Sequence, residues 1–596
     1  MARQLVGWSR LADWRAAGVA LMVRRCPAWV WQLCLLVLLV ELSLGVYQRY
    51  VSATDHLRQA QQAFARADLG GLQTGCAEVR AAVDAGRPLL LPLGVGSIVP
   101  IQRVQAWAAL PEIAAAGDQA CEALDAVAAP LGHTAAADQF SAAELLASTH
   151  SRPEAFTRAS ASLSSALDHV ERVQPDTLRA EPRLVPLADL LDRVQASRSQ
   201  LRSAATALSV LPDLAGRLLG ADRSRTYLLV GQNSDEARAT GGFIGTLGRL
   251  TLADGRVVSS DVRSSYDWDN HSAPRLLPPE ALQKYMNFGA WYVRDANWWI
   301  DFRTTAEQLL TLWDQHQGGA DQIDGVIAID EPALAGLLDA VGGVDVPELG
   351  GVVDGSNAQQ RLDQRRRSPE ALKSGVEYQR VKTQIVGALH HALLNKLVDA
   401  RGTQLLRVVL ALGRAAQDRH VLVWFRDSDL EEAAAAQAWD GALRPGSGDF
   451  LGVVATSMSY GKVMPYIVRE RQYTRRADRS SFLTLTYSNH YRPAAGAPWD
   501  PLVDGTWWDW HAGFLRHEQG AWLGYIRVLA PPGSALTSAD GWDDQPTTSL
   551  EDDVVVFGGP ILLEPGRART VTLTYSNPTP ADSPLRIFRQ PGDPDS

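Results

Sequence analysis

The sequence predicts an α/β protein that has an N-terminal transmembrane helix, a helical stalk, a mixed α/β domain and a C-terminal β-sandwich. Three observations predict this architecture: a long apolar run near the N-terminus, apolar residues at helical spacing after it, and strand-like runs that first alternate with helical ones and then stand alone. With 596 residues the chain exceeds one ordinary core. We expect five regions, which are residues 1–27, 28–47, 48–220, 221–445 and 446–596.

The composition limits the classes of function. Hydrophobic residues make up 46% of the chain and charged residues 21%, which excludes wholesale disorder. The formal net charge is −10, and binding to the phosphates of duplex nucleic acid requires a basic face. We therefore expect no nucleic-acid partner.

Residues 28–47 form a mostly apolar run that is long enough, as a helix, to cross a membrane. Before it lie one acid, Asp13, and five arginines, Arg3, Arg10, Arg15, Arg24 and Arg25. The positive-inside rule then makes residues 1–27 a cytoplasmic tail and places everything after Tyr47 outside the cytoplasm. A cleaved signal peptide is the alternative, although no clear A-x-A site follows the run.

Residues 48–220 are expected to form an extracytoplasmic helical region. Leu163, Leu167 and Val170 are examples of its apolar residues at helical spacing. Cys76 and Cys121 fall in this region, where an oxidising compartment permits a disulfide. Spacing does not give their separation in space, so a disulfide and two buried thiols both remain open.

The α/β domain, residues 221–445, begins with strands. Residues 226–230 form a buried apolar run, and the runs 246–252 and 256–262 flank Asp254-Gly255, which is a strong hairpin signal. Thr304 with Glu307 has the spacing of a capping box that opens a helix.

Further elements of this domain follow from its capping residues. Residues 322–329 are predicted to form another strand, and Asp330 is predicted to cap the helix that ends at Gly342-Gly343. Helices are expected from 375 to 416, and RLDQRRRS (361–368) is interpreted as a solvated charged loop. Strands that alternate with helices indicate an α/β layer.

The glycine- and proline-rich stretch 444–448 marks the boundary to the β-rich domain, residues 446–596 with a C-terminal tail. Its β-branched and aromatic runs are separated by turn residues, as in a β-sandwich. Tryptophans are frequent in WDPLVDGTWWDWH (499–511), with Trp522 and Tyr525 beyond it, and Trp291, Trp298 and Trp299 raise the same question in the α/β domain. Such rings either form the core or stack on sugars or a protein partner.

Strong enzyme signatures are absent from the sequence, including H-E-x-x-H, C-x-x-C, a Walker loop and G-x-S-x-G. The most informative stretch is GQNSDEARATGGFIG (231–245), which directly follows the predicted strand 226–230. Its polar groups could orient a ligand, or they could satisfy one another in an ordered loop, and its glycines permit a close approach of the backbone. The candidate ligand-binding residues are Asn233, Glu236, Arg238, Thr240, Gly241 and Gly242.

These residues also carry a family resemblance. The sequence resembles the bacterial domain-of-unknown-function family 4012 at YLLVGQNSDEARATGGFIGTLGRLTLADGRV (227–257), DFRTTAEQLLTLW (301–313), DGVIAIDEPALAGLLDAVGGVDVP (324–347), RAAQDRHVLVWF (414–425) and WDGAL (439–443). The resemblance implies a single-pass protein with an external helical part and a β-rich end. In VVATSMSYGKV (453–463) an asparagine typical of the family is missing near Ser457, so no role is expected for this loop.

A second resemblance is to the LytR-CpsA-Psr cell-wall phosphotransferases, at LLDAVGGVDV (337–346) and SSDVRS (259–264). It implies an α/β domain of that fold and a phosphate site formed by Arg263, Arg380 and Gln384, to which Arg365 to Arg367 could contribute. Asp261 and Asp267 are the implied catalytic carboxylates, able to bind a divalent cation such as magnesium or to accept a proton. The sequence departs from the pattern at Val262, Ser264 and Thr383.

Two functions follow from these expectations. The first is a membrane-anchored protein of the bacterial envelope that binds or transfers a polyprenyl-pyrophosphate-linked glycopolymer. The second is a non-catalytic surface protein that assembles or holds partners. The sequence leaves open whether the protein is an enzyme.

Overall fold

The computed structural model describes residues 105–128 and 151–593, except for 107, 182, 183, 197 and 494–498, and six isolated residues between 74 and 147. The predicted cytoplasmic tail, the predicted transmembrane helix 28–47 and Cys76 lie outside the described residues. No helix in the described part of the chain has the length and apolar character that a membrane span needs. The chain divides into two compact units, Met1–Gly216 with Arg401–Arg407, and Arg217–Ala400 with Val408–Ser596.

The described part of the first unit is mainly helical, as the apolar spacing predicts. Small side chains such as Ala123, Ala159 and Ala205 are buried where its helices pack, which lets the backbones approach closely. Cys121 is fully buried, and the choice between a disulfide and two buried thiols stays open because Cys76 is not described. The helices are α6 (Leu110–Ala128), α8 (Pro153–Glu171), α9 (Pro175–Arg179), α10 (Val185–Ala196) and α11 (Arg198–Leu218), the last of which ends in the second unit.

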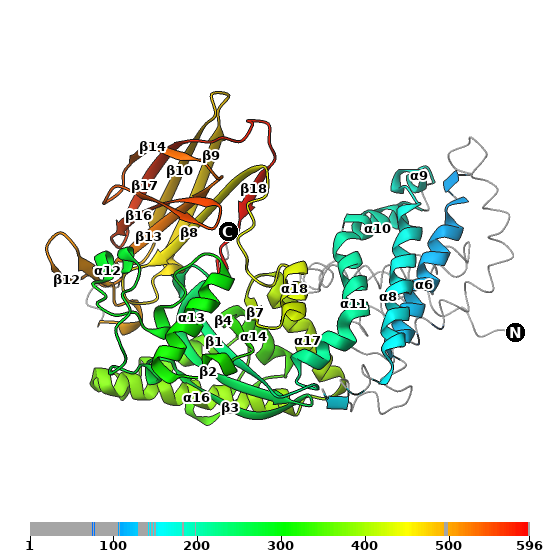
Figure 1. The fold of residues 1–596 in the computed structure, drawn as a ribbon, viewed down its shortest axis with the longest axis horizontal. Helices are drawn as coiled ribbons and strands as arrows, with labels where there is room; N and C mark the ends of the chain where they lie inside the picture. The colour runs from blue at the N-terminus through cyan, green and yellow to red at the C-terminus, as the bar shows by residue number, and fades with distance from the viewer. Residues whose placement is uncertain are drawn as a thin grey trace, which may run out of the picture. The chain divides into compact units, whose positions relative to one another are not determined.

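The second unit is built on a five-stranded mixed sheet with the order β3-β2-β1-β4-β7 (Figure 1). Only the central pair β1 and β4 is parallel, and the other neighbours are antiparallel. The predicted hairpin is confirmed, since Asp254 and Gly255 join β2 to β3 with φ values of 50° and 70°. The strands are β1 (Arg225–Arg238), β2 (Gly241–Ala253), β3 (Arg256–Ser264), β4 (Gly325–Asp330) and β7 (Val421–Phe425).

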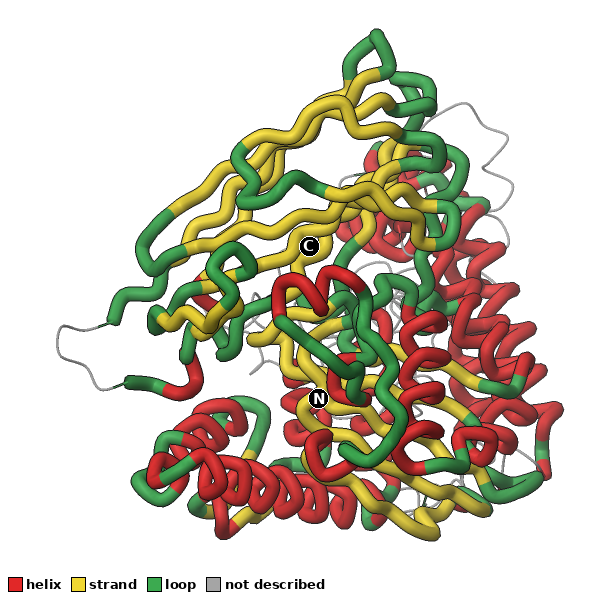
Figure 2. The backbone as a smooth tube through the Cα atoms, turned by 60° about the vertical axis from the view of Figure 1, so that its left-hand side comes forward, coloured by secondary structure: helices red, strands yellow, loops and turns green. Residues whose placement is uncertain are grey.

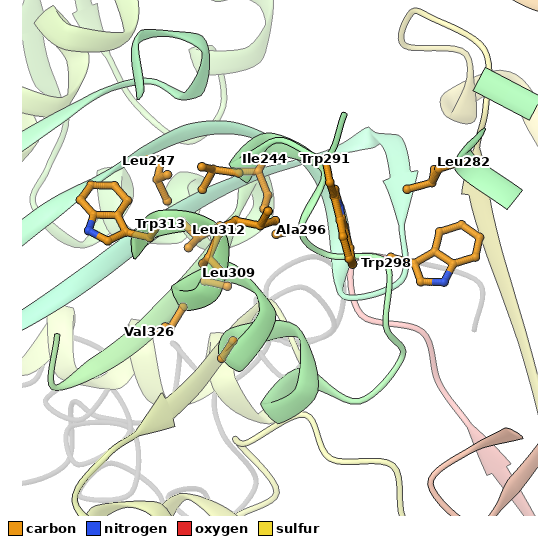
Figure 3. Packing of buried hydrophobic residues seen from close by; sticks show 14 of the residues in the cluster. Ile244, Leu247, Leu282, Trp291, Ala296, Trp298, Leu309, Leu312, Trp313 and Val326 are labelled. Atoms are coloured by element: carbon orange, nitrogen blue, oxygen red, sulfur yellow. The ribbon is translucent and has the colours of Figure 1, made fainter. Parts of the chain in front are cut away.

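Helix α13 (Phe302–Gln317) covers this sheet with an apolar face. Figure 3 shows Leu309, Leu312 and Trp313 of α13 beside Ile244 and Leu247 of β2. All five side chains are buried in one hydrophobic cluster. Burial of this face, rather than intrinsic propensity alone, holds the helix on the sheet.

The predicted start of α13 is wrong by a few residues. Asp301 caps the helix, because its side chain accepts a hydrogen bond from the Thr304 backbone N–H at 3.0 Å. Glu307 forms no capping box and instead binds Arg303 at 3.0 Å. A carboxylate at the N-cap accepts a hydrogen bond from a backbone N–H that has no partner within the helix. Its negative charge is also attracted to the positive end of the helix dipole.

Other helices of the unit agree largely with the prediction. Asp330 caps α14 as predicted, accepting from the Ala333 N–H at 3.1 Å. The predicted charged loop 361–368 is wrong, because most of it lies in helix α15 and Arg366 is buried. The remaining bounds are α12 (Glu280–Met286), α14 (Glu331–Ala340), α15 (Ala358–Arg366), α16 (Gly375–Val398), α17 (Gly402–Gln417) and α18 (Ser428–Ala436), with a small hairpin of β5 (Val344–Val346) and β6 (Gly351–Val353).

The C-terminal region is rich in strands, as predicted, and Figure 2 shows them gathered in yellow. Two sheets, β15-β16-β13-β8-β18 and β14-β17-β10-β9, share one hydrophobic cluster, which is the arrangement of a β-sandwich. Their strands are β8 (Asp449–Ser457), β9 (Ile467–Arg475), β10 (Ser480–Asn489), β13 (Trp522–Ala530), β14 (Ala535–Asp540), β15 (Thr547–Glu551), β16 (Val554–Leu563), β17 (Ala568–Ser576) and β18 (Leu585–Phe588), beside a hairpin of β11 (Thr506–Asp509) and β12 (Phe514–His517).

Most tryptophans in question belong to the core rather than to an exposed platform. Trp522 is fully buried in the cluster between the two sheets, whereas Trp499 is 50% exposed. Trp298 lies 5.6 Å, between ring centroids, from Tyr525 of β13, and its carbonyl accepts a hydrogen bond from Arg527 at 2.8 Å. The α/β sheet and the β-rich region of this unit therefore share packed residues.

Candidate functional site

The stretch 231–245 is a β-hairpin and not a loop. Strand β1 continues past Val230 to Arg238, β2 begins at Gly241, and the pairing shifts register near Gly231 and between Asn233 and Ala237. Gly241 has φ 136°, a conformation that favours glycine. A Cβ on Gly242 would lie 1.9 Å from the Asn233 carbonyl oxygen. The glycines thus allow one strand to approach the other closely.

Several motif side chains are satisfied within the hairpin and its immediate neighbours. Thr240 and the Gly242 N–H both donate to the side-chain oxygen of Gln232, at 3.4 and 3.0 Å. Asn233 accepts a hydrogen bond from the Asp235 N–H at 3.0 Å. Buried Arg238 donates to the Ser457 carbonyl of β8 at 2.8 Å. These bonds give the residues a structural role, and their predicted contact with a ligand stays a prediction.

Two charged groups near the hairpin have no hydrogen-bond or ion-pair partner among the described residues. The carboxylate of Glu236 and the ammonium of Lys382, on α16, make no hydrogen bond and no ion pair within 4.0 Å among the described residues. The Lys382 nitrogen lies 5.0 Å from the ring centre of Tyr266 and 5.8 Å from that of Phe243. Burial, with Arg366 as the next cause, lowers the pKa of Lys382 to about 8.

Charged and phenolic side chains from distant segments surround these two groups. Arg366 of α15 donates to Asp363 at 3.2 Å, and Arg294 lies 4.7 Å from the ring centre of Tyr266. Glu236 acts electrostatically on Tyr266 and on Tyr378 as well as on Lys382. We define the Lys382 cluster as Glu236, Tyr266, Arg294, Arg366, Tyr378, Lys382, Tyr460 and Lys462.

Lys462 comes from the loop after β8, to which sequence analysis assigns no role. It is buried, and its ammonium lies 3.4 Å from Asp235 and 3.7 Å from Asp363. Burial raises the pKa of the Asp235 carboxyl, and Lys462 opposes that rise. The β-rich region therefore contributes a cation to a site whose motif lies in the α/β sheet.

The rarity of lysine is a sequence signal for these two residues. The chain has five lysines among 57 basic residues, and Lys284, Lys373 and Lys396 are exposed. The other two, Lys382 and Lys462, belong to the cluster. Arginine and lysine are not interchangeable, because a lysine is a compact point charge whose pKa responds to burial. The few positions that carry lysine in an arginine-rich chain can thus be identified from the sequence as candidate site residues.

The structure places Arg263, Arg380 and Gln384 of the predicted phosphate site at the surface, and both arginines pair with acids. Arg263 of β3 donates to Asp261 at 2.9 Å and lies 4.2 Å from the ring centre of Trp268. Arg380 is half-exposed and binds Glu377 at 2.8 Å and also Glu370. Gln384 and Asp267 are exposed. Arg263 and Arg380 share no ion-pair partner among the described residues, and their ligand role stays a prediction.

The described residues do not fit a divalent cation at the predicted carboxylates. Arg263 occupies both oxygens of Asp261 through its Nε and Nη2 atoms. Across the described ranges, no three His, Cys, Asp or Glu side chains are grouped so that they could hold an ion. We therefore derive no step through magnesium.

Comparison with known proteins confirms the first resemblance. Residues 222–366 match the model of a family described as "Protein of unknown function (DUF4012)". No curated protein matches the chain. A similar solved structure is the X-ray structure of the Lin1025 protein from Listeria innocua, which is 14% identical and covers 37% of this chain and 78% of its own.

Its TM-score of 0.20 is too low to support an argument about fold or function. The resemblance to the LytR-CpsA-Psr phosphotransferases is not shown by these comparisons and stays a prediction. The matched residues contain the whole 231–245 hairpin together with Arg294 and Arg366 of the cluster. The chain is therefore a protein that carries a DUF4012 segment over residues 222–366.

Proposed function

We propose that the protein is a membrane-anchored, extracytoplasmic component of the bacterial envelope that binds a phosphate-linked glycopolymer through the Lys382 cluster. The observation that supports an anionic ligand is the charge around Lys382. Arg366, Lys462 and Arg294 contribute to lowering its pKa and Glu236 opposes them, but these three cations already pair with acids, whereas Lys382 has no ion pair among the described residues. A phosphate group would supply the missing counter-charge, because a buried ammonium without a partner is costly.

The class of ligand comes from the resemblance to the LytR-CpsA-Psr phosphotransferases, whose carriers are polyprenyl pyrophosphates. In this proposal Lys382 contacts a phosphate oxygen, and Arg366, which acts electrostatically on Lys382, adds positive charge to the same site. Arg263 and Arg380 remain a second candidate pair for the pyrophosphate. Transfer of the glycopolymer, and the fold of those enzymes for the α/β domain, belong to the proposal as well.

The alternative is a non-catalytic surface protein that holds partners in the envelope. One observation favours it, since Arg263 and Arg380 are each neutralised by neighbouring carboxylates. An arginine that already binds an acid must exchange that partner before it can bind phosphate. The alternative predicts that no phosphate compound binds at either place.

Calorimetric titration of the purified full-length protein with inorganic pyrophosphate tests the proposal. Lys382→Met should weaken binding at least about tenfold, as expected for loss of one charge-assisted contact. Lys396→Met is the matched control, because Lys396 lies on the same helix but is exposed. Equal affinity in the wild type and Lys382→Met, or no binding to the wild type, would overturn the proposed site.

The membrane topology needs a separate experiment. Single cysteines introduced at exposed positions such as Lys396 should react, in intact cells, with a reagent that does not cross membranes. Protection of such a cysteine until the cells are lysed would contradict the extracytoplasmic assignment.

A further inference from the structure

Glu236 differs from the acids near it in having no partner, since even Asp295, whose carboxylate accepts no hydrogen bond, pairs with Arg294 at 3.6 Å. Asp235 accepts a hydrogen bond from Gln359 at 3.1 Å, and Glu331 accepts one from the Ser234 N–H at 2.8 Å. Asp363 is bound by Arg366. Within the described residues, the carboxylate of Glu236 alone in this set has neither a hydrogen bond nor an ion pair with the protein. An ionised carboxylate has about four acceptor sites, so this group is available for a ligand.

Three phenol groups of the cluster, like the carboxylate of Glu236, have no hydrogen-bond partner among the described residues. The hydroxyls of Tyr266, Tyr378 and Tyr460 make no hydrogen bond to any described residue. Burial raises the pKa of Tyr266 to about 12, and Glu236 contributes to the rise, so the hydroxyl keeps its proton. Each phenol can donate one hydrogen bond and accept others. The cluster thus offers a carboxylate and several hydroxyls beside the ammonium of Lys382.

The charges indicate which donor Glu236 accepts. A ligand ammonium would enter beside Lys382, whose charge no described residue pairs within 4.0 Å, and like charges close together are disfavoured. A neutral hydroxyl avoids this repulsion and still forms a charge-assisted hydrogen bond to the carboxylate.

We propose that Glu236 is a specificity-determining residue that binds hydroxyl groups next to the phosphate of the ligand. The site then selects a phosphate ester of a polyol, such as a sugar phosphate, over inorganic pyrophosphate or an alkyl phosphate. This inference rests on the proposed function, because it places the phosphate at Lys382. The inference adds Glu236 as a second point of contact. A ligand must therefore carry a phosphate for Lys382 and a hydroxyl group for Glu236 to contact both residues.

The test compares glucose 1-phosphate, methyl phosphate and inorganic pyrophosphate in calorimetric titrations of the full-length protein. Wild-type protein should bind glucose 1-phosphate at least about tenfold more tightly than methyl phosphate. Glu236→Gln should weaken glucose 1-phosphate binding about tenfold and leave pyrophosphate unchanged or tighter, since it removes a negative charge near Lys382. Glu348→Gln, the same change at an exposed glutamate outside the cluster, is the matched control and should change neither.

The outcomes separate the two proposals. If the wild type binds none of the three compounds, the proposed function fails and the inference fails with it. If pyrophosphate binding depends on Lys382 but the wild type does not distinguish the two esters, only the role of Glu236 is overturned. Equal weakening of all three compounds in Glu236→Gln also overturns it, and the thermal unfolding of the variant shows whether the fold is intact.

Discussion

Replacing Glu331 with glutamine should remove a pH dependence of stability. Burial raises the pKa of Glu331 to about 7 from its usual 4.5, with Lys462 opposing and Asp235 adding to the rise. The folded protein therefore holds this proton to a higher pH than the unfolded chain does. The resulting stabilisation is fully present below about pH 4.5 and is lost as the pH rises through 7.

The size of the effect follows from the shift of the pKa. Each unit corresponds to about 1.4 kcal/mol, so a rise from 4.5 to about 7 gives a change of about 3 kcal/mol. Lys382 does not contribute in this window, because its pKa is lowered to about 8 and its own effect lies above that pH. Glutamine keeps an oxygen that can accept the hydrogen bond from the Ser234 N–H.

Urea unfolding between pH 4.5 and 8 measures this prediction, followed by tryptophan fluorescence. All described tryptophans lie in the second unit, which also contains Glu331. The free energy of unfolding of Glu331→Gln, minus that of the wild type, should increase by about 3 kcal/mol across this range. If the difference in free energy of unfolding between the two proteins stayed constant with pH, burial would not raise the pKa of Glu331, and the reasoning would be refuted.

Three further substitutions test the packing. Gly242→Ala should destabilise the protein by about 3 kcal/mol or more in urea unfolding, because its Cβ meets the backbone of the facing strand, whereas Gly245→Ala, with nothing within 4 Å, should stay within about 0.5 kcal/mol. Asp301→Ala should cost about 2 kcal/mol through the lost helix cap, and Asp301→Asn should recover part of this in the same assay. Trp522→Phe should lower the stability by about 2 kcal/mol, since it loses volume and the hydrogen bond to Ser457, and an unchanged thermal midpoint would contradict that.

Features set by local chemistry were predictable from the sequence. Asp254-Gly255 requires two residues with positive φ, and Asp330 caps a helix with its own side chain, so both need only their neighbours. The length of strand β1, by contrast, does not follow from neighbouring residues alone. Its polar residues up to Arg238 are held in a strand by pairing with β2, and that pairing depends on the missing side chain of Gly242.

The site was predictable only in part. The motif around Glu236 can be recognised in the sequence, but its division into residues that hold the hairpin and one that lacks a partner requires coordinates. Lys382 and Lys462 reach the motif through contacts distant in sequence, which periodicity does not reveal. By contrast, the acids that bind Arg263 and Arg380 are partly local, since Asp261 lies two residues from Arg263 on a strand and Glu377 lies three residues before Arg380 on a helix.

The central claim is that the half-buried side chain of Lys382 ends in an ammonium with no ion-pair partner within 4.0 Å among the described residues, and that a phosphate ligand supplies this partner. Nuclear magnetic resonance of protein labelled with ¹³C at the lysine Cε atoms tests it directly, because the chain has only five lysines and Lys382→Arg identifies the signal. The account predicts that this signal titrates near pH 8 and that pyrophosphate moves the titration to higher pH. A signal that titrates near the ordinary lysine value of about 10.4 and does not respond to pyrophosphate would contradict it.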